Sequence, residues 1–323
     1  MALGLSEHEQ GRVGAEGKDE QFTEPRVSTD NYEVDQPLTS SANPMGPRAH
    51  MRARPVESWN VFSARDEGSS AMTFKVMTTD VNHLDIADRK IAYRLREGAW
   101  PTLVFLPGYA SDMEGTKALA LDGLAQRHGL SMLRLDYSGT GSSSGAFEQG
   151  TLALWLEEAL AAIDQLTSGP LILVGSSMGG WIALHLALLR PQRVHGLVGV
   201  AAAPDFTNWG FDEDQKAVLG ADGRLEEANP YGPEPTTFTG AFWKSGQQLL
   251  LLGGELPLDC RVRLLHGECD GEVPLKIAFR LMQSLRSGDV QLNVLKGGGH
   301  RLSQPHEIDA ILRTVVNLLE PAP

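Results

Sequence analysis

Residues 171–181 read Leu171-Ile172-Leu173-Val174-Gly175-Ser176-Ser177-Met178-Gly179-Gly180-Trp181. An apolar run typical of a buried strand ends in a Gly-x-Ser-x-Gly pattern, and a helix-like apolar run follows at once. This is the sequence form of a nucleophile elbow, a sharp strand-to-helix turn that exposes the hydroxyl of its central serine. The two glycines lack a Cβ, so the strand and the helix can approach closely around the turn. The stretch therefore predicts that Ser177 is a nucleophile for acyl transfer.

A second stretch, Gly141-Ser142-Ser143-Ser144-Gly145, fits the same pattern. The residues before it are typical of a loop, and no apolar helix follows it. A nucleophile elbow needs a strand before the serine and a helix after it. We therefore interpret residues 141–145 as a turn and residues 175–179 as the elbow.

The composition suits one large domain with a full hydrophobic core. The chain has 323 residues, of which 41% are hydrophobic and 21% charged, and its net charge is −13. Such a charge argues against a nucleic-acid partner, and no apolar run approaches the roughly 18 residues of a membrane span. The only two cysteines, Cys260 and Cys269, match no metal or redox motif. We expect reduced thiols, no metal or organic cofactor, and a cytoplasmic protein.

Residues 1–70 differ from the rest of the chain. They are rich in glycine, proline, serine and acidic residues and show no helical or strand period, which predicts a disordered extension. They lack the apolar core of a secretory signal, and their acidic residues argue against a mitochondrial transit peptide. Met51 and Met72 are alternative starts of the chain, and the folded pattern is expected over 72–323.

From Met72 onward, strand-like and helix-like segments alternate, which predicts a mostly parallel sheet flanked by helices on both faces. The stretch 204–258 is less regular and rich in aromatic residues, so we interpret it as a small cap inserted into the domain. The expected strands are 73–78, 90–96, 102–106, 131–137, 171–175, 194–203, 261–265 and 290–295. The expected helices are 115–128, 152–166, 178–190, 275–286 and 306–319.

A serine nucleophile needs a base, and the base needs an orienting carboxylate. In a parallel sheet these groups come from loops at the carboxyl ends of strands. His300 follows the last expected strand, and Asp270 follows the strand at 261–265, so we predict that they are the base and the carboxylate. His266 is an alternative base in a crowded position, and Glu268 is the competing carboxylate.

The reaction also needs N–H donors for the oxyanion of the tetrahedral intermediate. Met178 follows the nucleophile at the start of a helix, where backbone N–H groups are free to bind an anion. The loop after the strand at 102–106 reads Pro107-Gly108-Tyr109. We predict that the N–H groups of Tyr109 and Met178 form the oxyanion hole; the alternative is that Pro107-Gly108 is only a turn.

The order Ser177, Asp270, His300 resembles that of the α/β-hydrolase superfamily. Four stretches resemble, within it, mitochondrial palmitoyl-protein thioesterases that also cleave mycophenolic acid acyl-glucuronide: Leu106-Pro107-Gly108-Tyr109, Arg134-Leu135-Asp136-Tyr137-Ser138-Gly139, Val174 to Trp181, and Arg263-Leu264-Leu265-His266-Gly267. The resemblance covers roughly 100–320, with poorly defined ends. It implies an α/β-hydrolase fold with a small cap, a Ser-His-Asp triad, and S-deacylation of proteins together with ester hydrolysis. The glycine-rich run Gly297-Gly298-Gly299 departs from the polar sequence expected before the histidine.

We therefore expect a serine hydrolase that cleaves an acylated protein or a small-molecule (thio)ester. Two alternatives are a general carboxylesterase and a non-catalytic binding protein on the same fold. The second is disfavoured because all three triad positions are intact. The cap aromatics either contact an acyl group or simply pack the cap onto the domain. The sequence carries no prediction of oligomeric state.

Overall fold

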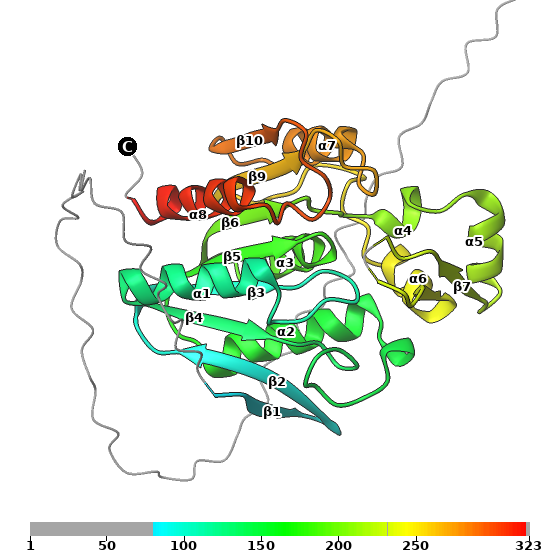
Figure 1. The fold of residues 1–323 in the computed structure, drawn as a ribbon, viewed down its shortest axis with the longest axis horizontal. Helices are drawn as coiled ribbons and strands as arrows, with labels where there is room; N and C mark the ends of the chain where they lie inside the picture. Colours follow the sequence, from blue (N-terminus) through cyan, green and yellow to red (C-terminus); the bar gives the residue numbers. More distant parts are fainter. Residues whose placement is uncertain (1–79, 231, 321–323) are drawn as a thin grey trace, which may run out of the picture. The chain divides into compact units, whose positions relative to one another are not determined.

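The computed structural model describes residues 80–230 and 232–320, and its centre is an eight-stranded sheet in the order β1-β2-β4-β3-β5-β6-β9-β10 (Figure 1). β1 pairs with β2 and β2 with β4 in antiparallel fashion, and all other pairings are parallel. This confirms the predicted mostly parallel sheet. The strands are β1 Asn82–Ile86, β2 Arg89–Arg96, β3 Ala99–Leu106, β4 Leu130–Leu135, β5 Leu171–Ser176, β6 Val194–Val200, β9 Arg261–Gly267 and β10 Val290–Leu295.

The start of the fold differs from the sequence prediction. The strand that pairs with β2 is β1, whereas the sequence predicted a partner strand at 73–78. Residues 73–78, like the predicted extension 1–70, lie outside the described residues. β1 was missed because only its last residue, Ile86, is buried, so its sequence carries little of the apolar alternation that indicates a strand.

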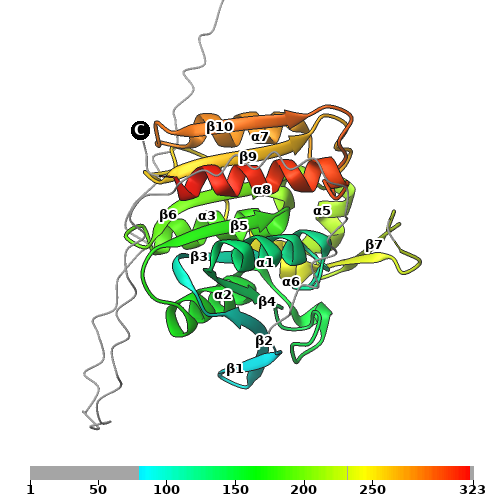
Figure 2. The same ribbon diagram turned by 60° about the vertical axis from the view of Figure 1, so that its left-hand side comes forward.

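Helices cover both faces of the sheet, whose edge strands are β1 and β10 (Figure 2). Along β3, Leu103 and Phe105 join the cluster of buried side chains that contains α1 and α8, whereas Val104 and Leu106 join the cluster that contains α2, α3 and α7. Because successive side chains of a strand point to opposite faces, a strand buried on both faces must be apolar throughout. The helices are α1 Thr116–His128, α2 Leu152–Leu166, α3 Met178–Leu189, α7 Leu275–Ser284 and α8 Pro305–Leu319.

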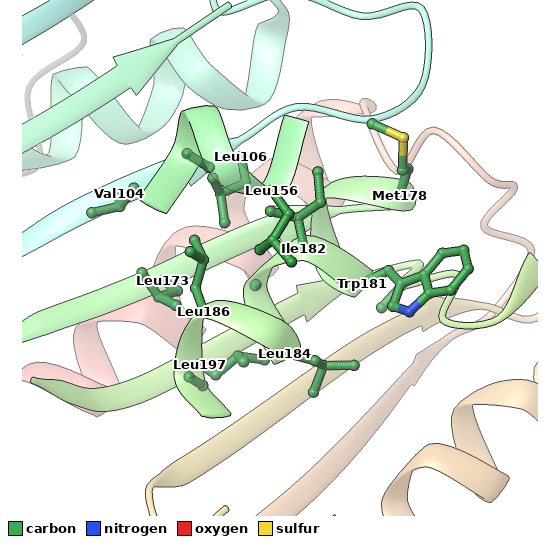
Figure 3. Packing of buried hydrophobic residues seen from close by; sticks show 14 of the residues in the cluster. Val104, Leu106, Leu156, Leu173, Met178, Trp181, Ile182, Leu184, Leu186 and Leu197 are labelled. Carbon is green, nitrogen blue, oxygen red and sulfur yellow. The ribbon is translucent and has the colours of Figure 1, made fainter. Parts of the chain in front are cut away.

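Helix α3, which follows Ser177, is apolar almost all round and lies in the core. Figure 3 shows its side chains Trp181, Ile182 and Leu186 among residues of β3, β5, β6 and α2. Each is at most 1% exposed, and burial of such a side chain stabilises the fold by roughly 1.5–3 kcal/mol. Ser177 therefore directly precedes a helix that is buried in the core along nearly its whole length.

The stretch 204–258, which we call the cap segment, contains regular elements that the sequence did not reveal. They are α4 Phe206–Trp209, α5 Glu213–Gly220, β7 Arg224–Glu227, β8 Thr236–Thr239 and α6 Gly240–Gln247, and β7 pairs with β8. The Asp205 carboxylate accepts the N–H groups of Leu251 and Leu252, both at 2.7 Å, so one side chain joins the two ends of the segment. Figure 1 shows α4, α5, α6 and β7 gathered at one end of the sheet. No helix among residues 80–230 and 232–320 has the length and apolar character needed to cross a membrane.

The elbow between β5 and α3 is strained. Ser177 has φ 53° and ψ −119°, a backbone conformation that L-residues rarely adopt and that costs about 1–3 kcal/mol. Two glycines allow it. A Cβ at Gly175 would run into the backbone of Gly179, and a Cβ at Gly179 would run into the carbonyl groups of Leu106 and Pro107.

We predict that Gly179→Ala destabilises the fold by about 3 kcal/mol, because the added methyl group meets backbone atoms that cannot move aside. Gly288→Ala is the matched control: a Cβ there has no heavy atom within 4 Å, and its effect should stay within about 0.5 kcal/mol. Urea unfolding of both variants checks this. Equal stability of the two variants would contradict the steric argument.

Candidate active site

Ser177, His300 and Asp270 come from three separate loops and meet at one edge of the sheet. They follow β5, β10 and β9, whose carboxyl ends lie at the same edge of the sheet because these strands, with β6 between β5 and β9, are parallel. His300 Nε2 lies 3.0 Å from Ser177 Oγ, and His300 Nδ1 lies 2.9 Å from Asp270 Oδ2. A carboxylate only accepts hydrogen bonds, so Nδ1 carries the proton and Nε2 is free to accept from the serine hydroxyl. The arrangement has the geometry of a nucleophile, a base and an orienting carboxylate.

The Asp270 carboxylate is fully buried and is held by more than the histidine. Its Oδ1 accepts the N–H groups of Glu272 and Val273, each at 2.9 Å. Burial by itself would raise the pKa of Asp270, but the hydrogen bond and charge of His300 and the two backbone N–H groups outweigh it and lower the pKa. Asp270 is therefore a charged acceptor for His300 at neutral pH.

The two competing side chains have other partners. His266 is 1% exposed, and its Nε2 lies 2.8 Å from the Val273 carbonyl oxygen and 3.4 Å from Asp270 Oδ2. Its Nε2 therefore faces the Val273 carbonyl oxygen and the Asp270 carboxylate. Glu268 accepts the N–H of Gly297 at 3.0 Å and does not contact His300.

The glycine-rich run before His300 has a structural cause. Gly298 accepts the N–H of Cys269 at 2.8 Å, and a Cβ at Gly267 would run into the Gly298 carbonyl group. Gly297 has φ 70°, a conformation that glycine adopts without strain. The run thus lets the loop that carries His300 lie directly against the loop that carries Asp270.

The loop after β3 passes directly beside the nucleophile. A Cβ at Gly108 would lie 3.3 Å from Ser177 Cβ, so Tyr109 follows a residue that is in close contact with the elbow. Within residues 80–230 and 232–320, the N–H groups of Tyr109 and Met178 donate no hydrogen bond. Both predicted oxyanion donors therefore flank Ser177 with their N–H groups available.

Ser177 and His300 line a cavity of about 670 Å³, whose wall contains both aromatic and charged residues. Its charged residues include Lys117, Glu272 and Arg301. Glu272 Oε2 lies 3.7 Å from His300 Nε2. The aromatic residues that line the cavity are Tyr109, Phe206, Trp209, Phe211 and Phe238.

The aromatic residues of the cap segment divide between the cavity wall and the interior. Phe206, Trp209, Phe211 and Phe238 line the cavity, whereas Phe242 is 1% exposed and packs inside. Trp243 Nε1 donates to the Thr207 carbonyl within the cap segment, and Tyr231 lies outside the described residues.

The sequence analysis missed the charged residues of the cavity wall. Lys117 lies at the start of α1, Glu272 two residues after Asp270, and Arg301 directly after His300. Their closeness in sequence to predicted site residues was the available signal. Lys117 Nζ donates to the Arg301 carbonyl at 2.6 Å and so contacts the loop that carries His300.

The second Gly-x-Ser-x-Gly stretch is a structural loop. Ser143 Oγ accepts the Ala92 N–H at 2.8 Å and donates to the Asp136 carbonyl at 2.7 Å, and Ser144 Oγ accepts the Lys90 N–H at 2.8 Å. These serines fasten residues 141–145 to β2, as expected of a turn.

An eight-stranded, mostly parallel sheet with a serine elbow at its carboxyl edge defines the α/β hydrolases. The family model described as "alpha/beta hydrolase fold" matches residues 101–231, and the chain belongs to this family. Within it, the chain is similar to the mitochondrial palmitoyl-protein thioesterase ABHD10 of Homo sapiens. The two are 36% identical over 239 residues, which are 71% of this chain and 76% of the human protein.

Solved structures give the same family. The chain is 32% identical to mouse alpha/beta hydrolase domain-containing protein 10, with a TM-score of 0.70 and coverage of 75% of this chain and 98% of that one. It is 40% identical to a putative hydrolase from Agrobacterium vitis S4, also with a TM-score of 0.70, covering 75% of this chain and 99% of that one.

The pKa of Lys117 predicts how the stability of the fold depends on pH. Burial, followed by the charge of Arg301, lowers the pKa of Lys117 to about 8, while Glu307 opposes the shift. The unfolded chain holds the lysine proton up to its ordinary pKa of 10.5, so between these values it binds more protons than the folded chain. Stability therefore rises with pH across this window.

We expect the free energy of unfolding of the wild type, relative to Lys117→Met, to increase by roughly 1–2 kcal/mol between pH 7 and pH 10, after allowance for solvent screening. Urea unfolding at several pH values measures the difference. A difference that does not change with pH would contradict the assignment.

Proposed function

We propose that the protein is a serine hydrolase that cleaves thioesters or esters through Ser177, His300 and Asp270. The observation that carries the proposal is the continuous chain of hydrogen bonds from Asp270 through His300 to Ser177 at the wall of a cavity. The strained elbow supports it, because strain of this kind gathers at functional sites. The similarity to a protein named palmitoyl-protein thioesterase supports a hydrolase of this class.

The proposed reaction has two halves. Ser177 Oγ attacks the acyl carbonyl carbon while His300 Nε2 takes the hydroxyl proton, and Asp270 stabilises the imidazolium that forms. The N–H groups of Tyr109 and Met178 bind the oxyanion of the tetrahedral intermediate. His300 then gives the proton to the departing sulfur or oxygen, which leaves as a thiol or alcohol. Water, activated by the same histidine, hydrolyses the acyl-enzyme and regenerates Ser177.

For the substrate we propose an acylated protein or a small-molecule (thio)ester whose acyl group lies against the aromatic residues of the cavity wall. Phe206, Phe211 and Phe238 are among these residues, and apolar walls favour an acyl chain or an aromatic acyl group. The charged residues of the wall, Lys117 and Arg301 among them, are then left for the group that departs.

A general carboxylesterase is the second candidate. The ring of Phe238 packs 5.1 Å from that of Phe211 and 6.2 Å from that of Phe206, centroid to centroid. These rings pack against one another in the cavity wall, which supports a compact or aromatic acyl group as the alternative.

The cellular compartment is a separate proposal. The sequence favours the cytoplasm, whereas the relative is named as a mitochondrial protein. Cell fractionation of the full chain distinguishes the two.

Ser177→Ala should abolish hydrolysis of both a palmitoyl-cysteine peptide and a short-chain aryl ester, because it removes the nucleophile. Ser143→Ala, in the loop with the same Gly-x-Ser-x-Gly pattern, is the matched control and should stay active in the folded state. Thioester turnover by the wild type supports the protein-deacylase candidate, and turnover of the aryl ester alone supports the carboxylesterase. Full activity of Ser177→Ala would refute the mechanism.

Asp270→Asn should lower kcat roughly 10³–10⁴-fold, because an amide no longer holds His300 in the tautomer that accepts the serine proton. Glu268→Gln, a carboxylate of the same loop that contacts Gly297 instead, should leave kcat within about twofold. Steady-state kinetics of both variants measure this. Equal losses in the two variants would count against the role of Asp270.

A further inference from the structure

The Tyr109 side chain connects the loop beside the nucleophile to the cap segment. Its hydroxyl donates to the carbonyl oxygen of Thr237, a residue of β8, at 2.5 Å. Thr237 is 8% exposed, so the bond is shielded from water, where hydrogen bonds are stronger. Burial raises the pKa of Tyr109, so the hydroxyl remains protonated and a donor at neutral pH.

Aromatic rings hold the same side chain on several sides. Its ring stacks on Phe238 of β8, with centroids 4.9 Å apart and planes 19° apart. Phe242 of the cap segment and Trp155 of α2 meet it edge to face, at 4.8 Å and 5.8 Å. Tyr109 is therefore fixed between the cap segment and the helical layer of the core.

The backbone of this loop needs such an anchor. Ala110 has φ 52°, in the left-handed region, which costs a residue with a Cβ about 1–2 kcal/mol. Strained residues keep their conformation only where surrounding contacts impose it. The one backbone hydrogen bond inside the turn, from Ser111 N–H to the Gly108 carbonyl, is 3.2 Å long. The contacts of the Tyr109 side chain fix the turn further, one residue before the strained Ala110.

We propose that the Tyr109 hydroxyl is a positioning group: by donating to Thr237 it holds the Tyr109 N–H in place for the oxyanion. The cap segment, and not the core alone, then completes the oxyanion hole. This inference rests on the proposed function, because it assigns the Tyr109 N–H to the tetrahedral intermediate. Met178, the other donor, needs no such help because α3 fixes it in the core.

Tyr109→Phe tests the proposal, because it removes the hydroxyl and keeps the ring. Loss of a single oxyanion donor costs about 10²–10³ in kcat, so a misplaced donor should lower kcat roughly 10–100-fold with KM within about twofold. A trifluoromethyl ketone that carries the acyl chain of the substrate forms a tetrahedral adduct with Ser177. It should bind Tyr109→Phe more weakly than the wild type, by the same factor by which kcat falls. A thioether analogue, which forms no adduct, should bind as it does to the wild type.

Ser245→Ala is the matched control. Ser245 Oγ accepts the Ala153 N–H at 2.9 Å, so it also joins the cap segment to the core, but it does not line the cavity. This variant should lose thermal stability comparable to that lost by Tyr109→Phe and keep kcat within about twofold. A folded Tyr109→Phe with wild-type kcat would overturn the proposal. So would equal losses of kcat in the two variants, because the cause would then be general loosening of the cap.

If Tyr109→Phe does not fold, replacement of Tyr109 by 4-fluorophenylalanine provides the test, because it keeps the ring and fills the space of the hydroxyl but cannot donate to Thr237. This replacement should weaken the binding of the trifluoromethyl ketone more than the binding of the thioether. Equal weakening of the two would overturn the proposal. The proposed function fails separately: an active Ser177→Ala refutes it. An inactive Ser177→Ala with a fully active Tyr109→Phe refutes only the role of the hydroxyl.

Discussion

The structure depends on the close approach of α3 to β3 and β5 around Ser177. Two glycines permit it, and the apolar surface of α3 drives it, because the helix is buried on nearly every side. The packing of that helix compensates for the strained backbone of the serine. The strain is useful, since it presents the hydroxyl at the edge of the sheet and leaves the first N–H of the helix free beside it.

A second constraint is the burial of Asp270. A buried carboxylate is unfavourable unless it is hydrogen-bonded, and here the acceptors are satisfied by His300 and by two backbone N–H groups of the carboxylate's own loop. This loop and the loop of His300 lie against each other through Gly267 and Gly298, where a side chain on either would not fit without a shift. The histidine is thus oriented by a charge that cannot move, which is how an active site avoids reorganisation during a reaction.

The cap segment is connected to the surroundings of Ser177 at two points. Asp205 joins its ends near Ala203, whose N–H donates to the Ser177 carbonyl, so its base is attached next to the elbow. Its strand β8 also contacts the loop after β3 through Tyr109. The segment that lines part of the cavity is therefore connected to the two loops that lie beside Ser177. A displacement of the cap segment would act on both loops.

Much of the fold follows from the sequence because its signals are local. An apolar run, a glycine pair and a helix-like run in direct succession predict the elbow at Ser177, and the loops after the strands at 261–265 and 290–295 predict Asp270 and His300. In the described residues His300 lies within hydrogen-bond distance of both Ser177 and Asp270. β1 was not predicted, because an edge strand with one buried residue lacks the periodic signal of a core strand.

Only the tertiary structure decided the composition of the cavity wall and the elements of the cap segment. Lys117 and Glu272 are ordinary charged residues in sequence, and they come to lie against His300 or its loop only when the chain folds. The bond from Tyr109 to Thr237 joins residues 128 positions apart, and no local pattern specifies it. Sequence determines which segments become strands, turns and helices, because backbone preference and apolar spacing act over a few residues. The contacts that shape the site arise between segments far apart in the chain, and only packing brings them together.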